Sequence, residues 1–137
     1  GMRLGFAIGN KELIKGLKNI KFSFNSYTIN RLSILAGIEA FKDEEYFKKS
    51  VSKIISTREK TKEELKKLDF KVLDSKSNFL FISHNKILGE NIYLKLKEKG
   101  ILVRYFKKEI INNFIRVTIG TDKEMIIFIN ALKEIIN

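Results

Sequence analysis

The chain has 137 residues, of which 44% are hydrophobic and none is cysteine, and its formal net charge is +11. This length predicts one domain, or one domain with part of another, and the lack of cysteine excludes disulfides and thiolate metal sites. No apolar run reaches the ~20 residues that a membrane helix needs and no stretch is typical of a signal peptide, so the composition predicts a cytoplasmic protein without a membrane partner.

The first 42 residues predict elements that belong to a larger structure. An apolar stretch at residues 4–8 predicts a strand, residues 11–17 a short helix, and residues 23–26 an irregular link. Residues 27–41 predict a helix that is apolar on most sides, as expected of a helix buried between layers or domains. The sequence therefore predicts a domain boundary near residue 42.

From residue 43 onward the pattern is that of an α+β domain. Asp43 is a suitable N-cap for a long amphipathic helix. The elements expected after it are strands at 70–73 and 79–82, a helix at 90–99, strands at 101–106 and 114–119, and a helix from Thr121. Gly100 is expected just past the end of the middle helix, and Thr121 with Glu124 predicts a capping box. This order predicts a small sheet of about four strands, largely antiparallel, with helices packed on one face.

The single histidine and the basic charge point to no metal or nucleic acid. His84 cannot form a histidine-rich metal site, and we interpret it as a loop residue without a catalytic role. A basic surface can bind nucleic acid, but the 22 lysines are spread along the whole chain, so we favour a general lysine bias of the source. Only five arginines occur in the chain. Because the guanidinium is a rigid donor that can form two parallel hydrogen bonds, each arginine is a candidate for binding a specific anion.

Two of these arginines lie on the last two expected strands. Strand side chains alternate, so if the apolar residues face the helices, Arg104 and Arg116 both point to the opposite side. In a hairpin centred on Ile110 they would be directly opposed, with Cβ atoms about 4.5–5.5 Å apart. Two guanidiniums ~5 Å apart repel by about 3 kcal/mol at an effective dielectric near 20, so a carboxylate or phosphate between them would be favourable. The alternative is that both arginines reach water or pair with Glu109 or another acid.

A family resemblance covers essentially the whole chain. The opening GMRLGFAIGN resembles the segment that follows the cofactor lysine in fold type I aminotransferases. The stretches NSYTINRLSILAGIEAF and SKSNFLFI resemble the interdomain helix and a strand of histidinol-phosphate aminotransferases. The closing GILVRYF and FIRVTIGTDKEM resemble the end of the same family, and this last pattern is the most specific of the set.

The resemblance implies roles for three arginines. Arg3 corresponds to the arginine that binds the phosphate of pyridoxal phosphate, Arg116 to the arginine that grips the substrate phosphate, and Arg104 to a second arginine at that phosphate. The full-length parent would be a cytoplasmic homodimer that transfers an amino group between histidinol phosphate and 2-oxoglutarate in histidine biosynthesis. Residues 1–42 would be a remnant of the large cofactor-binding domain with the interdomain helix, and residues 43–137 the C-terminal small domain.

The chain departs from the family pattern by lacking the Schiff-base lysine, the aspartate that pairs the pyridine nitrogen and the aromatic residue that stacks on the cofactor ring. None of its lysines lies in the Schiff-base lysine motif, so we expect the chain alone to be inactive and to leave the cofactor unbound. Threonine-phosphate decarboxylase and other class II aminotransferases are the alternatives within the enzymes. A stand-alone module that binds an anion or nucleic acid is the alternative outside them.

Overall fold

The structure, a computed structural model, describes residues 3–136. The chain divides into two compact units, Gly1–Lys48 and Lys49–Asn137, and the division falls inside helix α3 (Glu44–Lys67). The expected origin of residues 1–42 in a larger domain stays a prediction. Every helix within residues 3–136 is too short or too polar to cross a membrane.

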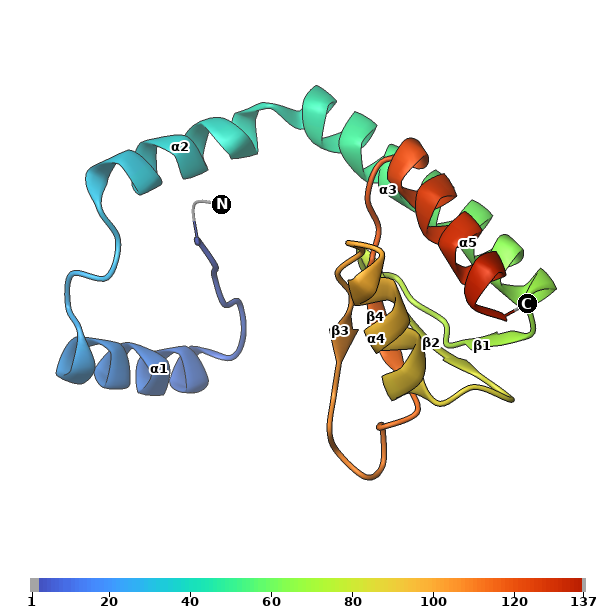
Figure 1. Ribbon diagram of the computed structural model, residues 1–137. Helices are drawn as coiled ribbons and strands as arrows, with labels where there is room; N and C mark the ends of the chain where they lie inside the picture. Colours follow the sequence, from blue (N-terminus) through green and yellow to red (C-terminus); the bar gives the residue numbers. More distant parts are fainter. Residues whose placement is uncertain (1–2, 137) are drawn as a thin grey trace. The chain divides into compact units, whose positions relative to one another are not determined.

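The first unit contains the helices α1 (Lys11–Phe24) and α2 (Arg31–Lys42) (Figure 1). Each begins after an asparagine whose side-chain oxygen accepts a backbone N–H, which satisfies one of the free donors of the first turn. The expected helix at 11–17 is longer than predicted, and the expected link at 23–26 begins only after Phe24. The expected helix at 27–41 begins at Arg31, because Asn30 caps it with a bond from Ser33 of 2.8 Å.

The predicted strand at residues 4–8 is wrong, because residues 3–10 have no regular structure. A strand needs a hydrogen-bonded neighbour, and residues 3–48 contain no other strand that would provide one. The segment instead contacts α2 through side chains. The ring of Phe6 lies 5.7 Å from that of Phe41, and a Cβ on Gly37 would stand 2.6 Å from Leu4 Cδ1.

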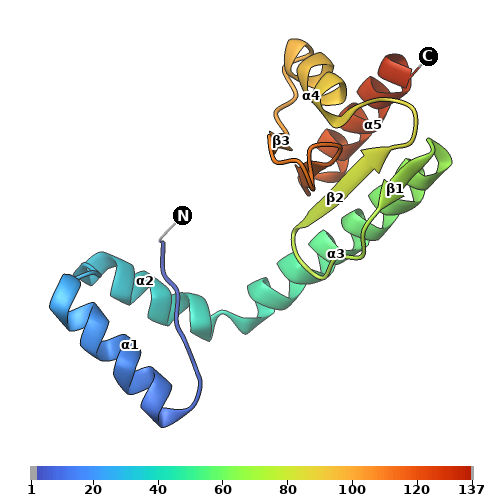
Figure 2. The same ribbon diagram turned by 90° about the horizontal axis from the view of Figure 1, so that it is seen from below.

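The second unit contains a four-stranded sheet made of β1 (Phe70–Val72), β2 (Phe79–His84), β3 (Arg104–Tyr105) and β4 (Ile115–Thr118). The strands lie in the order β1-β2-β4-β3 (Figure 1), and every neighbouring pair is antiparallel. Figure 2 shows β1 and β2 side by side. The predicted α+β sheet is therefore confirmed. Strand β3 is shorter than the predicted strand at 101–106, because only two of its residues pair with β4.

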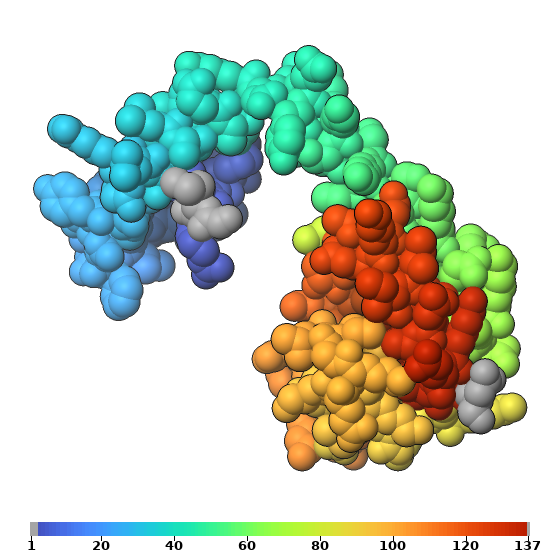
Figure 3. Space-filling view, turned by 45° about the horizontal axis from the view of Figure 1, so that its top comes forward, coloured from blue at the N-terminus to red at the C-terminus, as the bar shows by residue number. Residues whose placement is uncertain are grey.

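Three helices, α3, α4 (Gly89–Glu98) and α5 (Asp122–Ile136), bury their apolar faces against one side of this sheet. Helices α4 and α5 lie next to each other on the surface of the unit (Figure 3). The side chains that are fully buried come from both layers: Leu65, Leu80, Ile82, Ile92, Leu96, Ile115 and Leu132. Because side chains alternate along a strand, the residues between these core positions point to the uncovered side of the sheet.

The predicted helix ends are confirmed. Asp43 accepts the backbone N–H of Tyr46 at the start of α3, and Gly100 takes the left-handed φ of 74° just after α4. Thr121 and Glu124 bond each other reciprocally before α5, as a capping box does.

The interpretation of His84 as a loop residue is wrong. His84 is the last residue of β2, is only 4% exposed, and meets the ring of Phe70 edge to face with 4.9 Å between ring centroids. The cause is the register of the sheet, which pairs His84 with Phe70 on the core side.

Candidate anion-binding site

Arg104 and Arg116 are directly opposed on β3 and β4, as the sequence predicted. The next pair in the register is Tyr105 with Ile115, and Ile115 is 1% exposed in the core. Alternation along each strand therefore directs both arginines to the side of the sheet that the helices leave uncovered. We call this side the open face.

The open face also carries four phenylalanines and a lysine: Phe79, Phe81, Phe106, Phe114 and Lys71. The rings of Phe81 and Phe114 are stacked at 4.8 Å between centroids, and Phe106 meets Phe81 edge to face at 6.2 Å. Lys71 Nζ lies 6.0 Å from the centroid of the Phe114 ring. The arginine pair therefore lies beside an aromatic layer and not among acidic side chains.

Neither arginine of the pair has an acidic partner within residues 3–136. No carboxylate oxygen of this part of the chain comes within 4.0 Å of either guanidinium, so the alternative pairing with Glu109 is not observed. Arg104 is exposed and does reach solvent, whereas Arg116 is half-buried and its Nε is buried without a hydrogen-bond partner. A guanidinium that has no acidic partner among the described residues can donate charge-assisted hydrogen bonds to an anion.

The third predicted site residue, Arg3, belongs to the other compact unit. Its side chain is exposed and its backbone takes a left-handed φ of 56°, which is uncommon for a residue other than glycine. An exposed guanidinium is a suitable partner for a phosphate group. The structure therefore brings together Arg104 and Arg116, whereas Arg3 lies in the other unit.

Sequence reasoning missed the roles of Arg58 and Phe79. Arg58, on α3, is only 7% exposed and donates from Nη1 to the carbonyl oxygen of Ser77 at 2.9 Å. Phe79 begins β2, and its ring lies under the guanidinium of Arg116, with 5.3 Å between Cζ and the ring centroid. The only available signal for Arg58 was an arginine retained in a lysine-rich helix, and no local pattern pairs Phe79 with Arg116.

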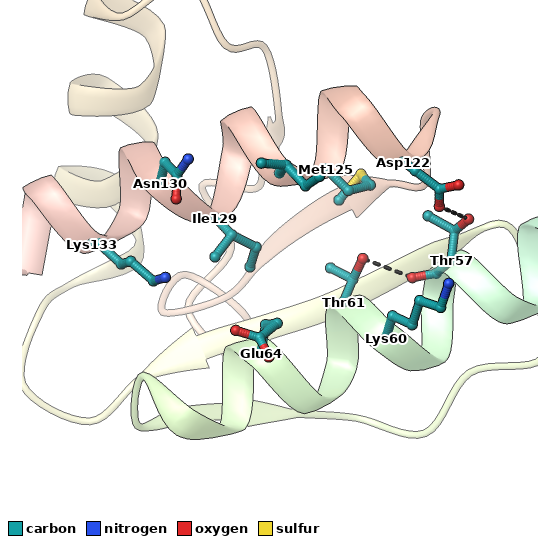
Figure 4. A pocket seen from close by; sticks show the side chains of 10 residues that line it. Thr57, Lys60, Thr61, Glu64, Asp122, Met125, Ile129, Asn130 and Lys133 are labelled. Carbon is teal, nitrogen blue, oxygen red and sulfur yellow. Dashed lines mark hydrogen bonds between the residues drawn. The ribbon is translucent and has the colours of Figure 1, made fainter.

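A groove of about 400 Å³ lies elsewhere in the second unit, between α3 and α5 (Figure 4). Its floor is apolar and contains Met125 and Ile129, and its rim carries Lys60 and Lys133. At one end Thr57 donates to the carboxylate of Asp122 at 2.6 Å. None of the three predicted site residues lines this groove, so the hollow and the charged site are separate features.

Comparison with known proteins places these observations in a family. The family model for aminotransferase class I and II matches residues 1–132. The chain is 72% identical over 136 residues to the histidinol-phosphate aminotransferase of Brachyspira hyodysenteriae. This alignment covers 99% of this chain and 38% of that protein.

Two solved structures are similar in fold as well as in sequence. The histidinol-phosphate aminotransferase from Clostridium acetobutylicum is 29% identical with a TM-score of 0.80, covering 93% of this chain and 39% of its own. The enzyme of that name from Sinorhizobium meliloti, solved in complex with pyridoxal-5'-phosphate, is 26% identical with a TM-score of 0.79, covering 88% and 34%. The chain thus spans between 34% and 39% of the length of these relatives.

Proposed function

The chain belongs to the class I and II aminotransferases, and from this membership we propose that it is part of an enzyme that transfers an amino group between histidinol phosphate and 2-oxoglutarate. The high identity to a histidinol-phosphate aminotransferase supports this substrate. The observation that carries the proposal is the pair of opposed arginines, which have no acidic partner among residues 3–136, because such a pair suits a phosphate dianion better than a single carboxylate.

In the proposed reaction Arg104 and Arg116 bind the substrate phosphate, which is remote from the carbon that reacts. A phosphate offers several acceptor oxygens, so each guanidinium can donate more than one hydrogen bond. Binding energy from this distant group can orient the amino group toward the cofactor. The two arginines therefore position the substrate and take no part in proton transfer.

The proposed cofactor is pyridoxal phosphate, with Arg3 as a ligand of its phosphate group. When bound, this cofactor supplies an electron-withdrawing ring that stabilises charge at the carbon carrying the amino group. The residues present fit the phosphate part of the cofactor through the exposed guanidinium of Arg3. None of the chain's lysines lies in the family's lysine motif, so the 137 residues alone are expected to have no transaminase activity.

We further propose that residues 1–42 belong with the cofactor-binding domain and that residues 43–137 are the small domain. The exposure of nearly all apolar side chains in the first unit supports a further packing partner for that unit. A cytoplasmic location and a homodimer remain predictions that rest on the family.

A chimera would test the proposed substrate. The chain would replace the matching segment of the Brachyspira hyodysenteriae enzyme, and amino transfer from histidinol phosphate would be followed at steady state. Arg104→Ala and Arg116→Ala should each raise the KM for histidinol phosphate about ten- to a hundredfold, because each removes charged hydrogen bonds. Lys123→Ala, which removes an exposed charge on α5, is the matched control and should change nothing.

Measurements on the chimera and on the 137-residue chain separate the alternatives. Release of carbon dioxide from threonine phosphate without amino transfer from histidinol phosphate would favour the decarboxylase. Unchanged KM values in both arginine variants would reject the assigned site. Binding of duplex DNA by the 137-residue chain that persists at moderate salt would favour a nucleic-acid-binding module, since non-specific binding weakens steeply with salt.

A further inference from the structure

Each arginine of the pair lies over a phenylalanine ring. Arg116 Cζ is 5.3 Å from the centroid of Phe79, and Arg104 Cζ is 5.6 Å from the centroid of Phe106. Both distances are within the ~6 Å over which a ring attracts a cation through its quadrupole. Both phenylalanines are half-buried, so their rings are already part of the packed open face.

A ring holds a guanidinium differently from a carboxylate. A carboxylate accepts hydrogen bonds and occupies N–H donors, whereas the face of a ring attracts the charge and leaves the donors free. Within residues 3–136 neither guanidinium makes a hydrogen bond to another protein group or an ion pair. The contacts with Phe79 and Phe106 therefore fix both cations without using the groups that an anion needs.

The position of Phe79 is itself fixed by its neighbours in the chain. Ser75 Oγ donates to the carbonyl oxygen of Phe79 at 2.6 Å, and Ser77 Oγ accepts the backbone N–H of Phe79 at 3.4 Å. The carbonyl oxygen of Ser77 in turn accepts from the buried Arg58 of α3. Because both ends of this turn are bonded, the Phe79 ring is held at the start of β2 beneath Arg116.

We propose that Phe79 and Phe106 are positioning residues whose rings hold Arg116 and Arg104 ready for a phosphate group with their N–H donors unoccupied. The inference rests on the proposed function, because it assigns how the same pair is prepared for its ligand. It separates the open face into residues that bind the anion and residues that hold the binders. Phe81 stacks on Phe114 and meets Phe106 edge to face, so it packs against one of the two rings that hold the arginines.

The test uses the 137-residue chain with inorganic phosphate as the probe and Arg Nε–H signals in NMR as the readout. The chain has five arginines, so these signals are few enough to assign. Phe79 would be replaced by mono-, di- and trifluorophenylalanine, which keep the shape of the ring but weaken its quadrupole. Phosphate affinity should fall stepwise, by about three- to tenfold for the trifluoro ring, and the Arg116 Nε–H signal should lose its ring-current shift in Phe79→Leu.

The same series at Phe128, which is buried in the core on α5 and makes no contact with the arginine pair, is the matched control and should show no trend. A flat affinity across the Phe79 series, with Arg116→Ala still abolishing phosphate binding, would overturn the positioning role and leave the proposed function standing. Phosphate binding that Arg116→Ala leaves unchanged would reject the proposed anion site itself. An equal trend at Phe79 and Phe128 would show a general effect of fluorine on the second unit and would also overturn the inference.

Discussion

The two units of the chain use similar amphipathic helices but differ in what those helices cover. In the second unit, α3, α4 and α5 bury their apolar faces on a sheet, and one core joins both layers. In the first unit, within residues 3–48, only Ser33 is buried, and large apolar side chains such as Phe24 and Tyr27 are more than nine-tenths exposed. An apolar pattern thus predicts that a face is to be buried but not which surface buries it.

This difference has an energetic consequence that mutations can test. Apolar area removed from water stabilises a fold by roughly 25 cal/mol per Å², so side chains in the second unit stabilise the native state and most of those in the first do not. Exposed apolar faces of this extent are typical of interaction surfaces. Matched substitutions in the two units should therefore have unequal effects on stability.

The largest contrast is expected between two leucines. Leu132→Ala empties a fully buried position on α5 and should lower the free energy of unfolding by about 2–5 kcal/mol. Leu17→Ala on α1 alters a half-exposed side chain and should change it by no more than about 0.5 kcal/mol. Urea unfolding followed by far-UV circular dichroism, which reports the helices of both units, measures both, and equal losses would contradict the contrast.

Two glycines should respond in opposite directions. A Cβ at Gly89 would stand 2.8 Å from the backbone carbonyl of Asn113, so Gly89→Ala should destabilise the second unit by about 1–3 kcal/mol. Gly16 in α1 has open space around it, so Gly16→Ala should stabilise that helix by about 0.5–1 kcal/mol. Urea midpoints and far-UV helicity report the two effects. A stabilised Gly89→Ala protein would contradict the prediction, because it would mean that the backbone at Asn113 shifts at little cost in free energy.

The smallest effect concerns the pH dependence of the helix starts. The pKa of Glu124 is lowered, first by the hydrogen bond from the backbone N–H of Thr121 and then by that from its hydroxyl. A lowered folded-state pKa means that this stabilisation is present above the unfolded-state pKa and is lost as pH falls through the folded-state value.

Glu124→Gln should therefore lower the Tm at neutral pH and reduce the fall of Tm below the ordinary pKa of glutamate. Helices α1 and α2 begin after the neutral amides Asn10 and Asn30, so Asn30→Asp is the matched change that should add a pH dependence in the first unit. Thermal unfolding at stepped pH tests both. Identical pH profiles for Glu124→Gln and the unaltered chain would show that the capping box does not contribute.

Much of the second unit was predictable because its rules are local. The capping box at Thr121, the glycine after α4 and the order of elements follow from residues that are neighbours in sequence. The opposition of Arg104 and Arg116 was also predictable, because a short hairpin connection fixes which residues face each other. The strand expected at 4–8 was wrong for the complementary reason, since an apolar run becomes a strand only where a neighbouring strand offers hydrogen bonds.

The candidate site was only partly predictable. Its charged residues stand out in the sequence because arginine is rare in this chain. The phenylalanine rings that contact them do not stand out, because Phe79 is distant from Arg116 in sequence and lies on another strand. Arg58 was visible as an unusual residue, yet its bond to Ser77 depends on how α3 packs on the turn before β2.

The sequence by itself determined the α+β order, the caps and the register of the arginine pair, because alternation, capping and hairpin geometry act over a few residues. The tertiary structure alone decided that His84 is buried, that residues 3–10 stay irregular and that phenylalanine rings lie under the two guanidiniums. These features depend on which distant segments come into contact. The free energy of such a contact depends on both segments, so neither segment predicts it alone.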